Sequence, residues 1–183
     1  MKKVLALLLA LTMVFAAVAC APAGGTGGAK KYAIIVKNTG NPYNDKEAAG
    51  FQEACKEIGV ECIIKAPANP TAEDQIAMIQ ELISQKVTGI AIAANDYDAL
   101  ENALKKAMDA GIVVATVDSN ANPNSRMTFA NQADTIQIGK TLVETAFDLT
   151  GGSGQFAILS ATAQAANQNA WIAEMEKALT DPK

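Results

Sequence analysis

The sequence has 183 residues, a formal net charge of −4 and hydrophobic residues at half of its positions, which suits one domain of ordinary size or one and a part. An acidic chain without a basic run has no electrostatic reason to bind nucleic acid, so we expect no such partner. Because the chain contains no histidine, it lacks the commonest general base and the commonest zinc ligand, and we expect neither a metal site nor a cofactor.

The N-terminus starts with Lys2-Lys3 and continues with an apolar run of 16 residues, 4–19, before Cys20. A basic start, a short apolar middle and small residues before the cut are typical of a secretory signal peptide, here residues 1–19. Because a cysteine follows, the site resembles the lipobox of bacterial lipoproteins, although Ala17 stands where leucine is usual. We therefore expect lipid on Cys20 to anchor the protein to the bacterial cell membrane. An uncleaved membrane helix is the alternative, but the run is short against the ~20 residues that span a bilayer.

Residues 20–31 come next, and positions 21–29 hold only alanine, proline, glycine and threonine. Such a composition cannot pack a core and is typical of a flexible tether. Its glycine-rich run precedes the first predicted strand, whereas a phosphate-binding loop lies between a strand and a helix. The segment therefore does not indicate a nucleotide site.

Beyond residue 31, hydrophobic periodicity predicts strands and helices in alternation. Apolar runs predict strands at 32–36, 61–65, 89–93, 113–117, 126–130 and 156–159. Apolar residues at three- and four-residue steps predict helices at 44–58, 71–83, 97–108 and 134–149, and a last helix that holds Trp171 and Leu179. Thr71 and Asp134 are the expected N-caps of two of these helices. The alternation predicts an α/β fold with a doubly wound parallel sheet covered by helices on both faces.

Two further cysteines, Cys55 and Cys62, fall on the apolar face of a predicted helix and in the following strand. Their spacing is neither a metal pattern nor a redox Cys-x-x-Cys motif. An exported protein could form a disulfide here. We favour the interpretation that both are small core residues.

Polar side chains gather where the predicted strands end, which is the edge at which such sheets bind ligands. Turns and helix caps use the same residue types, and for Asn95, Asp96 and Asn120 we favour that role. Lys37 serves neither a cap nor a core, so we expect it to pair with Asp118 in a ligand site. The candidate ligand-binding residues are Lys37, Asn38, Asn41, Tyr43, Asn95, Asp118, Asn167, Gln168 and Trp171.

These groups suit a small polyhydroxylated ligand, because a sugar hydroxyl both donates and accepts hydrogen bonds. Hydrogen bonds to charged groups are worth about 1.5–3 kcal/mol, which favours lysine and aspartate over neutral side chains. Tyr43 and Trp171 could stack on the apolar face of a sugar, with core packing an equal alternative for Trp171.

Several of these stretches match a known family. The matching positions are Lys37, 89–95, 99–111, 117–119, 131–132 and the motif Asn167-Gln168-Asn169-Ala170-Trp171. There the chain resembles the type I periplasmic sugar-binding proteins of bacterial ABC importers, and most closely the branch of rhamnose-binding and autoinducer-2-binding receptors. The resemblance implies ligand contacts at Lys37, Asp118, Asn167 and Gln168. Asn167 favours the rhamnose-type relatives, since this position is typically aspartate in the autoinducer-binding members.

The resemblance also implies a two-lobed, hinged monomer that passes a monosaccharide such as rhamnose to an ABC transporter permease outside the cytoplasm. In this interpretation the first lobe occupies 32–131 and is nearly complete, whereas 132–183 only begins the second lobe. Family members continue for a similar length again. We therefore expect the chain by itself to bind weakly or not at all.

Two other classes of function fit the sequence less well. An enzyme on a doubly wound sheet would have to act without histidine, without a glycine-rich loop after the first strand and without a nucleophile elbow. The effector lobe of a transcription regulator shares the family fold, but a signal peptide stands where a DNA-binding helix pair would be. We therefore expect no enzymatic activity.

Overall fold

The apolar runs between residues 31 and 130 form one parallel sheet, and the computed structural model describes residues 29–180 of the chain. The strands are β1 (Lys31–Ile35), β2 (Glu61–Lys65), β3 (Gly89–Ile92), β4 (Val113–Val117) and β5 (Thr128–Ala130), in the order β2-β1-β3-β4-β5. All four neighbouring pairs are parallel. The order reverses direction between β1 and β3, and such a switch point opens a crevice at the carboxyl ends of the strands.

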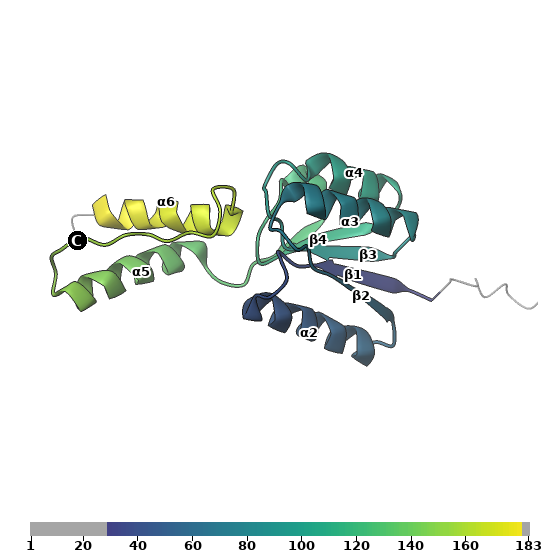
Figure 1. Ribbon diagram of the computed structural model, residues 1–183, viewed down its shortest axis with the longest axis horizontal. Coiled ribbons are helices and arrows are strands. Elements are labelled where there is room, and N and C mark those ends of the chain that lie inside the picture. The colour runs from purple at the N-terminus through teal and green to yellow at the C-terminus, as the bar shows by residue number, and fades with distance from the viewer. Residues whose placement is uncertain (1–28, 181–183) are drawn as a thin grey trace, which may run out of the picture.

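Helices cover both faces of the sheet, as predicted. Helix α2 (Pro42–Glu57) lies on one face, whereas α3 (Ala72–Ser84) and α4 (Glu101–Asp109) lie on the other (Figure 1). The central strands are buried on both sides, and Ile35 and Ile92 have no exposed surface. The predicted doubly wound parallel sheet is therefore confirmed.

Two predicted helix starts are also confirmed. The Thr71 hydroxyl accepts a hydrogen bond from the Asp74 amide, and Asp134 Oδ1 accepts one from the Gln137 amide at 2.8 Å. The helix expected from residue 97 begins only at Glu101. The cause is local, because Asp96 Oδ1 accepts hydrogen bonds from the amides of residues 98 and 99 and holds this segment in a turn.

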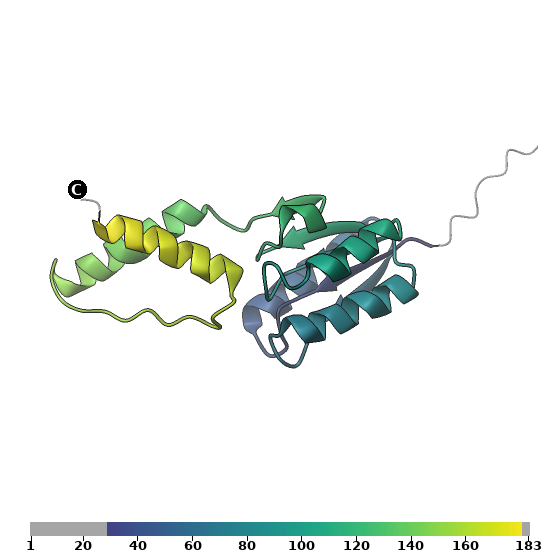
Figure 2. The same cartoon turned by 90° about the horizontal axis from the view of Figure 1, so that it is seen from above.

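The last two helices, α5 (Thr135–Thr150) and α6 (Ala166–Thr180), pack on each other to one side of the sheet (Figures 1 and 2). The strand predicted at 156–159 is wrong, since the structure assigns no strand there. A strand needs a neighbour to satisfy its backbone groups, and none of the described strands pairs with this segment. Leu159 is accordingly 98% exposed.

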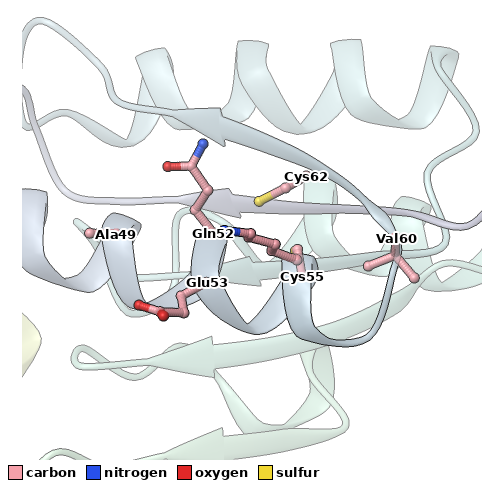
Figure 3. Close-up of a pocket in the computed structure, with 7 residues that line it drawn as sticks. Ala49, Gln52, Glu53, Cys55, Val60 and Cys62 are labelled. Atoms are coloured by element: carbon pink, nitrogen blue, oxygen red, sulfur yellow. The ribbon is translucent and has the colours of Figure 1, made fainter.

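Cys55 is buried and Cys62 is half-buried, and both are free thiols. Figure 3 shows them lining a pocket between the second half of α2 and β2, together with Ala49, Gln52, Glu53 and Val60. Burial is the main cause that raises the pKa of the Cys62 thiol to about 12, and the neighbouring Cys55 adds to the rise. Little reactive thiolate therefore forms at neutral pH. The buried Cys55 agrees with our prediction of a core residue.

The predicted signal peptide, the lipid site at Cys20 and most of the predicted tether lie outside the described residues. Between residues 29 and 180, no helix is both long enough and apolar enough to cross a bilayer.

Candidate functional site

The candidate site lies at the carboxyl edge of the sheet, beside the switch point between β1 and β3. Parallel strands all end at the same edge, so the residues that follow them come together. Lys37 follows β1, Asn95 follows β3 and Asp118 follows β4. Asn167, in the first turn of α6, reaches the same place from the helix pair.

Three side chains meet there and form what we call the charged cluster, Lys37, Asp118 and Asn167. Lys37 Nζ lies 3.8 Å from Asp118 Oδ2 and donates a hydrogen bond to Asn167 Oδ1 at 2.9 Å. Asn167 Nδ2 donates to Asp118 Oδ1 at 3.3 Å. The side chains of Lys37 and Asp118 are only 16% and 6% exposed. Lys37 and Asp118 thus lie close together, as predicted, and Asn167 bridges the pair.

Backbone geometry aims Asp118 at the cluster. Its φ of +53° lies in the left-handed region, which asparagine and aspartate tolerate better than other residues with a side chain. The next residue, Ser119, accepts a hydrogen bond from the Ala94 amide at 3.1 Å, which ties the β4 end to the β3 end.

Asn95 positions Lys37 through a hydrogen bond to its backbone. Its Nδ2 donates to the Lys37 carbonyl at 2.9 Å, and its own amide donates to Gln75 Oε1 at 2.9 Å. The fully buried Gln75 also donates to the Ala93 carbonyl at 2.8 Å. This long-range contact differs from the turn or cap role favoured for Asn95, and it uses one of the two N–H donors of the side-chain amide. Gln75 was not predicted, although a glutamine among the apolar positions of α3 was a signal that could have identified it.

The other candidates from the first loop play different parts. Asn41 is the N-cap of α2, and its side-chain oxygen accepts a hydrogen bond from the Tyr43 amide. Asn38 holds the start of α2, because its Oδ1 accepts a hydrogen bond from Asn44. Tyr43 is 49% exposed, and burial, followed by the negative charge of the nearby Asp118, raises the pKa of its phenol. Tyr43 therefore belongs to the site, whereas Asn38 and Asn41 form the loop that presents it.

The two remaining candidates sit on α6 beside Asn167. Gln168 Oε1 accepts hydrogen bonds from Ser160 Oγ and the Ala161 amide, both at 2.7 Å, and thereby holds the preceding loop. Trp171 is half-buried one helical turn beyond Asn167. The other two residues assigned to turns behave as predicted, because Asp96 forms its local turn and Asn120 Oδ1 accepts from Ala121 and Arg126.

Charges in the site are balanced against burial. Burial lowers the pKa of Lys37 and raises the pKa of Asp118, and their mutual attraction opposes both shifts. Glu47 lies on α2 one turn after Tyr43, and the charges of Asp118 and Lys37 both act on its carboxyl. Burial, and after it the negative charge of Asp118, raises the pKa of Glu47 to about 7, while Lys37 opposes the rise. Sequence reasoning missed Glu47, because its four-residue spacing from Tyr43 indicates a shared helix face but not where that face points.

We expect Glu47→Gln to stabilise the fold at pH 8 by about 1 kcal/mol, a value reduced for the partial exposure of Glu47. The pKa of Glu47 is raised above its ordinary value of 4.5, so the folded state binds the proton more tightly than the unfolded state. The stabilisation from protonation is complete below about pH 4.5 and is lost as the pH rises through about 7. Urea unfolding of both variants at pH 4.5 and pH 8 measures the difference.

Glu53→Gln is the matched control for that measurement, since Glu53 is exposed on the same helix. We expect its effect on the free energy of unfolding to be the same at both pH values within ~0.5 kcal/mol, as for most surface substitutions. An equal effect of Glu47→Gln at both pH values would contradict the raised pKa.

Residues 32–183 match the family model of the periplasmic binding protein domain. Among solved structures, the chain is similar to an ABC transporter solute-binding protein from Clostridium phytofermentas with bound L-rhamnose, at 51% identity and a TM-score of 0.82. That match covers 84% of this chain and 48% of the other.

Two further solved structures are similar. A solute-binding protein from Burkholderia graminis, in complex with D-arabinose, is 34% identical with a TM-score of 0.77, and the match covers 83% of this chain and 53% of that one. LsrB from Clostridium saccharobutylicum, in complex with AI-2 (autoinducer-2), is 28% identical with a TM-score of 0.72, over 80% and 48% of the two chains. The chain therefore spans about half of the length of the solved relatives that it matches.

Proposed function

The chain belongs to the periplasmic binding protein family, and on that premise we propose that it provides half of the ligand site of an extracytoplasmic sugar receptor that serves an ABC importer. The observation that carries the proposal is the charged cluster at the carboxyl edge of the sheet. The relatives of the chain are solute-binding proteins and not enzymes, which fits a site built from one ion pair and amide groups.

The charged cluster has hydrogen-bonding capacity left for a polyol. A lysine ammonium has three N–H donors. In the structure, Lys37 donates one hydrogen bond to Asn167, and a second N–H is available for the ion pair with Asp118. The third proton remains for a ligand oxygen, and the two Asp118 oxygens can accept further hydrogen bonds from ligand hydroxyls. The exposed ring of Tyr43 offers an apolar surface for the carbon face of a sugar ring.

A monosaccharide such as L-rhamnose is the ligand that we favour. The L-rhamnose-bound relative is 51% identical, whereas the autoinducer-2-bound relative is 28% identical. Asn167 supports the same choice, since the resemblance implies aspartate there in autoinducer-binding proteins. Autoinducer-2 is the alternative ligand, on the strength of the second similarity.

The wider setting of the receptor follows the same proposal. We assign residues 32–131 to the first lobe and 132–183 to the start of the second, so that a ligand binds between them and closes the hinge. Exposed apolar residues of α5, such as Leu149 at 83% and Phe147 at 60%, are then covered by the rest of the second lobe. Lipid on Cys20 anchors this monomeric receptor at the outer side of the membrane, where it meets a transporter permease.

A thermal-shift panel tests the ligand class in what we call the extended protein, in which this chain continues beyond Lys183 with the remaining sequence of the L-rhamnose-bound relative. A ligand at a hundred times its dissociation constant should add about 2.7 kcal/mol to stability. We expect this result for L-rhamnose, and weaker or no stabilisation by D-arabinose and autoinducer-2. Stabilisation by autoinducer-2 alone would establish the alternative, and turnover of any of these compounds would contradict a pure receptor.

A further inference from the structure

Glu47 carries a buried oxygen that the charged cluster does not use. Its Oε2 atom is inaccessible to solvent, yet no described residue hydrogen-bonds to it. Buried polar atoms in folded proteins almost always have a partner, and an exception calls for a specific explanation. Here the exception stands next to the charged cluster.

The position of Glu47 places this oxygen on the cluster side of α2. Tyr43 and Glu47 are one helical turn apart and therefore share a face. The charge of Asp118 acts on both side chains, and the charge of Lys37 acts on the Glu47 carboxyl. The half-buried Glu47 therefore lies on the face of α2 that is near the cluster.

We propose that Glu47 is a ligand-contacting residue that, as a neutral carboxylic acid, donates a hydrogen bond to an oxygen of the bound sugar. This inference rests on the proposed function and adds a proton donor to its site. A neutral acid has one O–H donor and keeps acceptor capacity, so it suits a hydroxyl oxygen of a polyol.

The surroundings favour the neutral form. The charged and titratable groups that face Glu47 are Asp118 from the β4 end, Lys37 from the β1 end and Tyr43 from its own helix. Asp118 repels a second negative charge, and Lys37 is already shared between Asp118 and Asn167. A ligand that closes the site also removes water from Glu47, which disfavours the charged form further. Ligand binding and protonation of Glu47 therefore support each other.

This coupling predicts a pH dependence of affinity. If only the protonated form binds the ligand, the apparent dissociation constant is the intrinsic value divided by the protonated fraction. With a Glu47 pKa of about 7, affinity for L-rhamnose should weaken about tenfold between pH 6 and pH 8. In Glu47→Gln, the amide donates a hydrogen bond at either pH. The ratio of the dissociation constant at pH 8 to that at pH 6 should therefore fall from about 10 to about 1.

The experiment measures L-rhamnose affinity at pH 6 and pH 8 for the wild type, Glu47→Gln and Glu53→Gln. NMR titration of the 183-residue chain detects weak binding, and calorimetry of the extended protein gives the same ratio with both lobes present. Glu53→Gln, the exposed control on the same helix, should keep the tenfold ratio. Amide spectra of each variant report whether the fold is intact.

Each outcome decides one of the two proposals. Binding that weakens at pH 8 in the wild type but not in Glu47→Gln supports the proton donor. Binding with the same affinity at both pH values, or tighter at pH 8, overturns the role of Glu47 and leaves the sugar-receptor function standing. No stabilisation of the extended protein by any monosaccharide at either pH overturns the receptor function itself.

Discussion

The Asp118→Asn variant of the extended protein should bind L-rhamnose at least about 100-fold more weakly than the wild type. The substitution removes charge-assisted hydrogen bonds worth about 1.5–3 kcal/mol each and leaves the Lys37 ammonium, only 16% exposed, without its counter-charge. A loss of about 2.8 kcal/mol already corresponds to 100-fold in affinity. Isothermal titration calorimetry at pH 6, where Glu47 is mostly protonated, measures the change.

Asparagine is the informative replacement at this position. It is close to aspartate in shape, and it tolerates the left-handed backbone of residue 118, where alanine would add strain. A loss of affinity in Asp118→Asn therefore reports on charge and not on a rearranged loop. Asp109→Asn is the matched control, because Asp109 is exposed at the end of α4, away from the charged cluster. An Asp118→Asn protein that binds L-rhamnose as tightly as Asp109→Asn would remove the physical basis of the receptor proposal.

The sheet could be predicted closely from sequence, because each central strand carries its own signal. A strand buried on both faces is an uninterrupted apolar run, and β3 was identified within one residue on that ground. The segment 156–159 carries the same signal and is not a strand. The difference lies outside the segment, since a run of apolar residues becomes a strand only where another strand offers its backbone.

The site could be predicted in part, and the boundary has a physical reason. Lys37 and Asp118 were identified because a parallel sheet brings the ends of its strands to one edge. Asn167 was expected to follow a strand at 156–159 that the structure does not contain, and only the family resemblance linked it to Lys37, 130 positions earlier. Glu47 escaped altogether, because whether a polar helix residue faces solvent or a cleft depends on how the helix is turned on the sheet.

Gly139→Ala should destabilise the helix pair by about 2–3 kcal/mol, in the range of overpacked cores. A methyl group at Gly139 in α5 would lie 2.5 Å from Cβ of Glu174 and 3.0 Å from the backbone nitrogen of Met175, both in α6. Backbone inside a helix cannot move aside alone, so the two helices must separate. Because α6 carries Asn167, the separation also pulls the bridging amide away from Lys37 and Asp118. Amide hydrogen exchange across α5 and α6 measures the loss of protection.

Gly50→Ala provides a control of opposite sign. Gly50 is also helical, in α2, but a methyl group there meets nothing within 4 Å. Alanine is favoured over glycine in a helix by about 0.8–1 kcal/mol, so this variant should be more stable than the wild type. The same propensity acts at Gly139 and must be overcome by the clash with α6. If Gly139→Ala were stabilising as well, α5 and α6 would not pack in solution as closely as the structure has them, and Asn167 would lose the support that places it in the site.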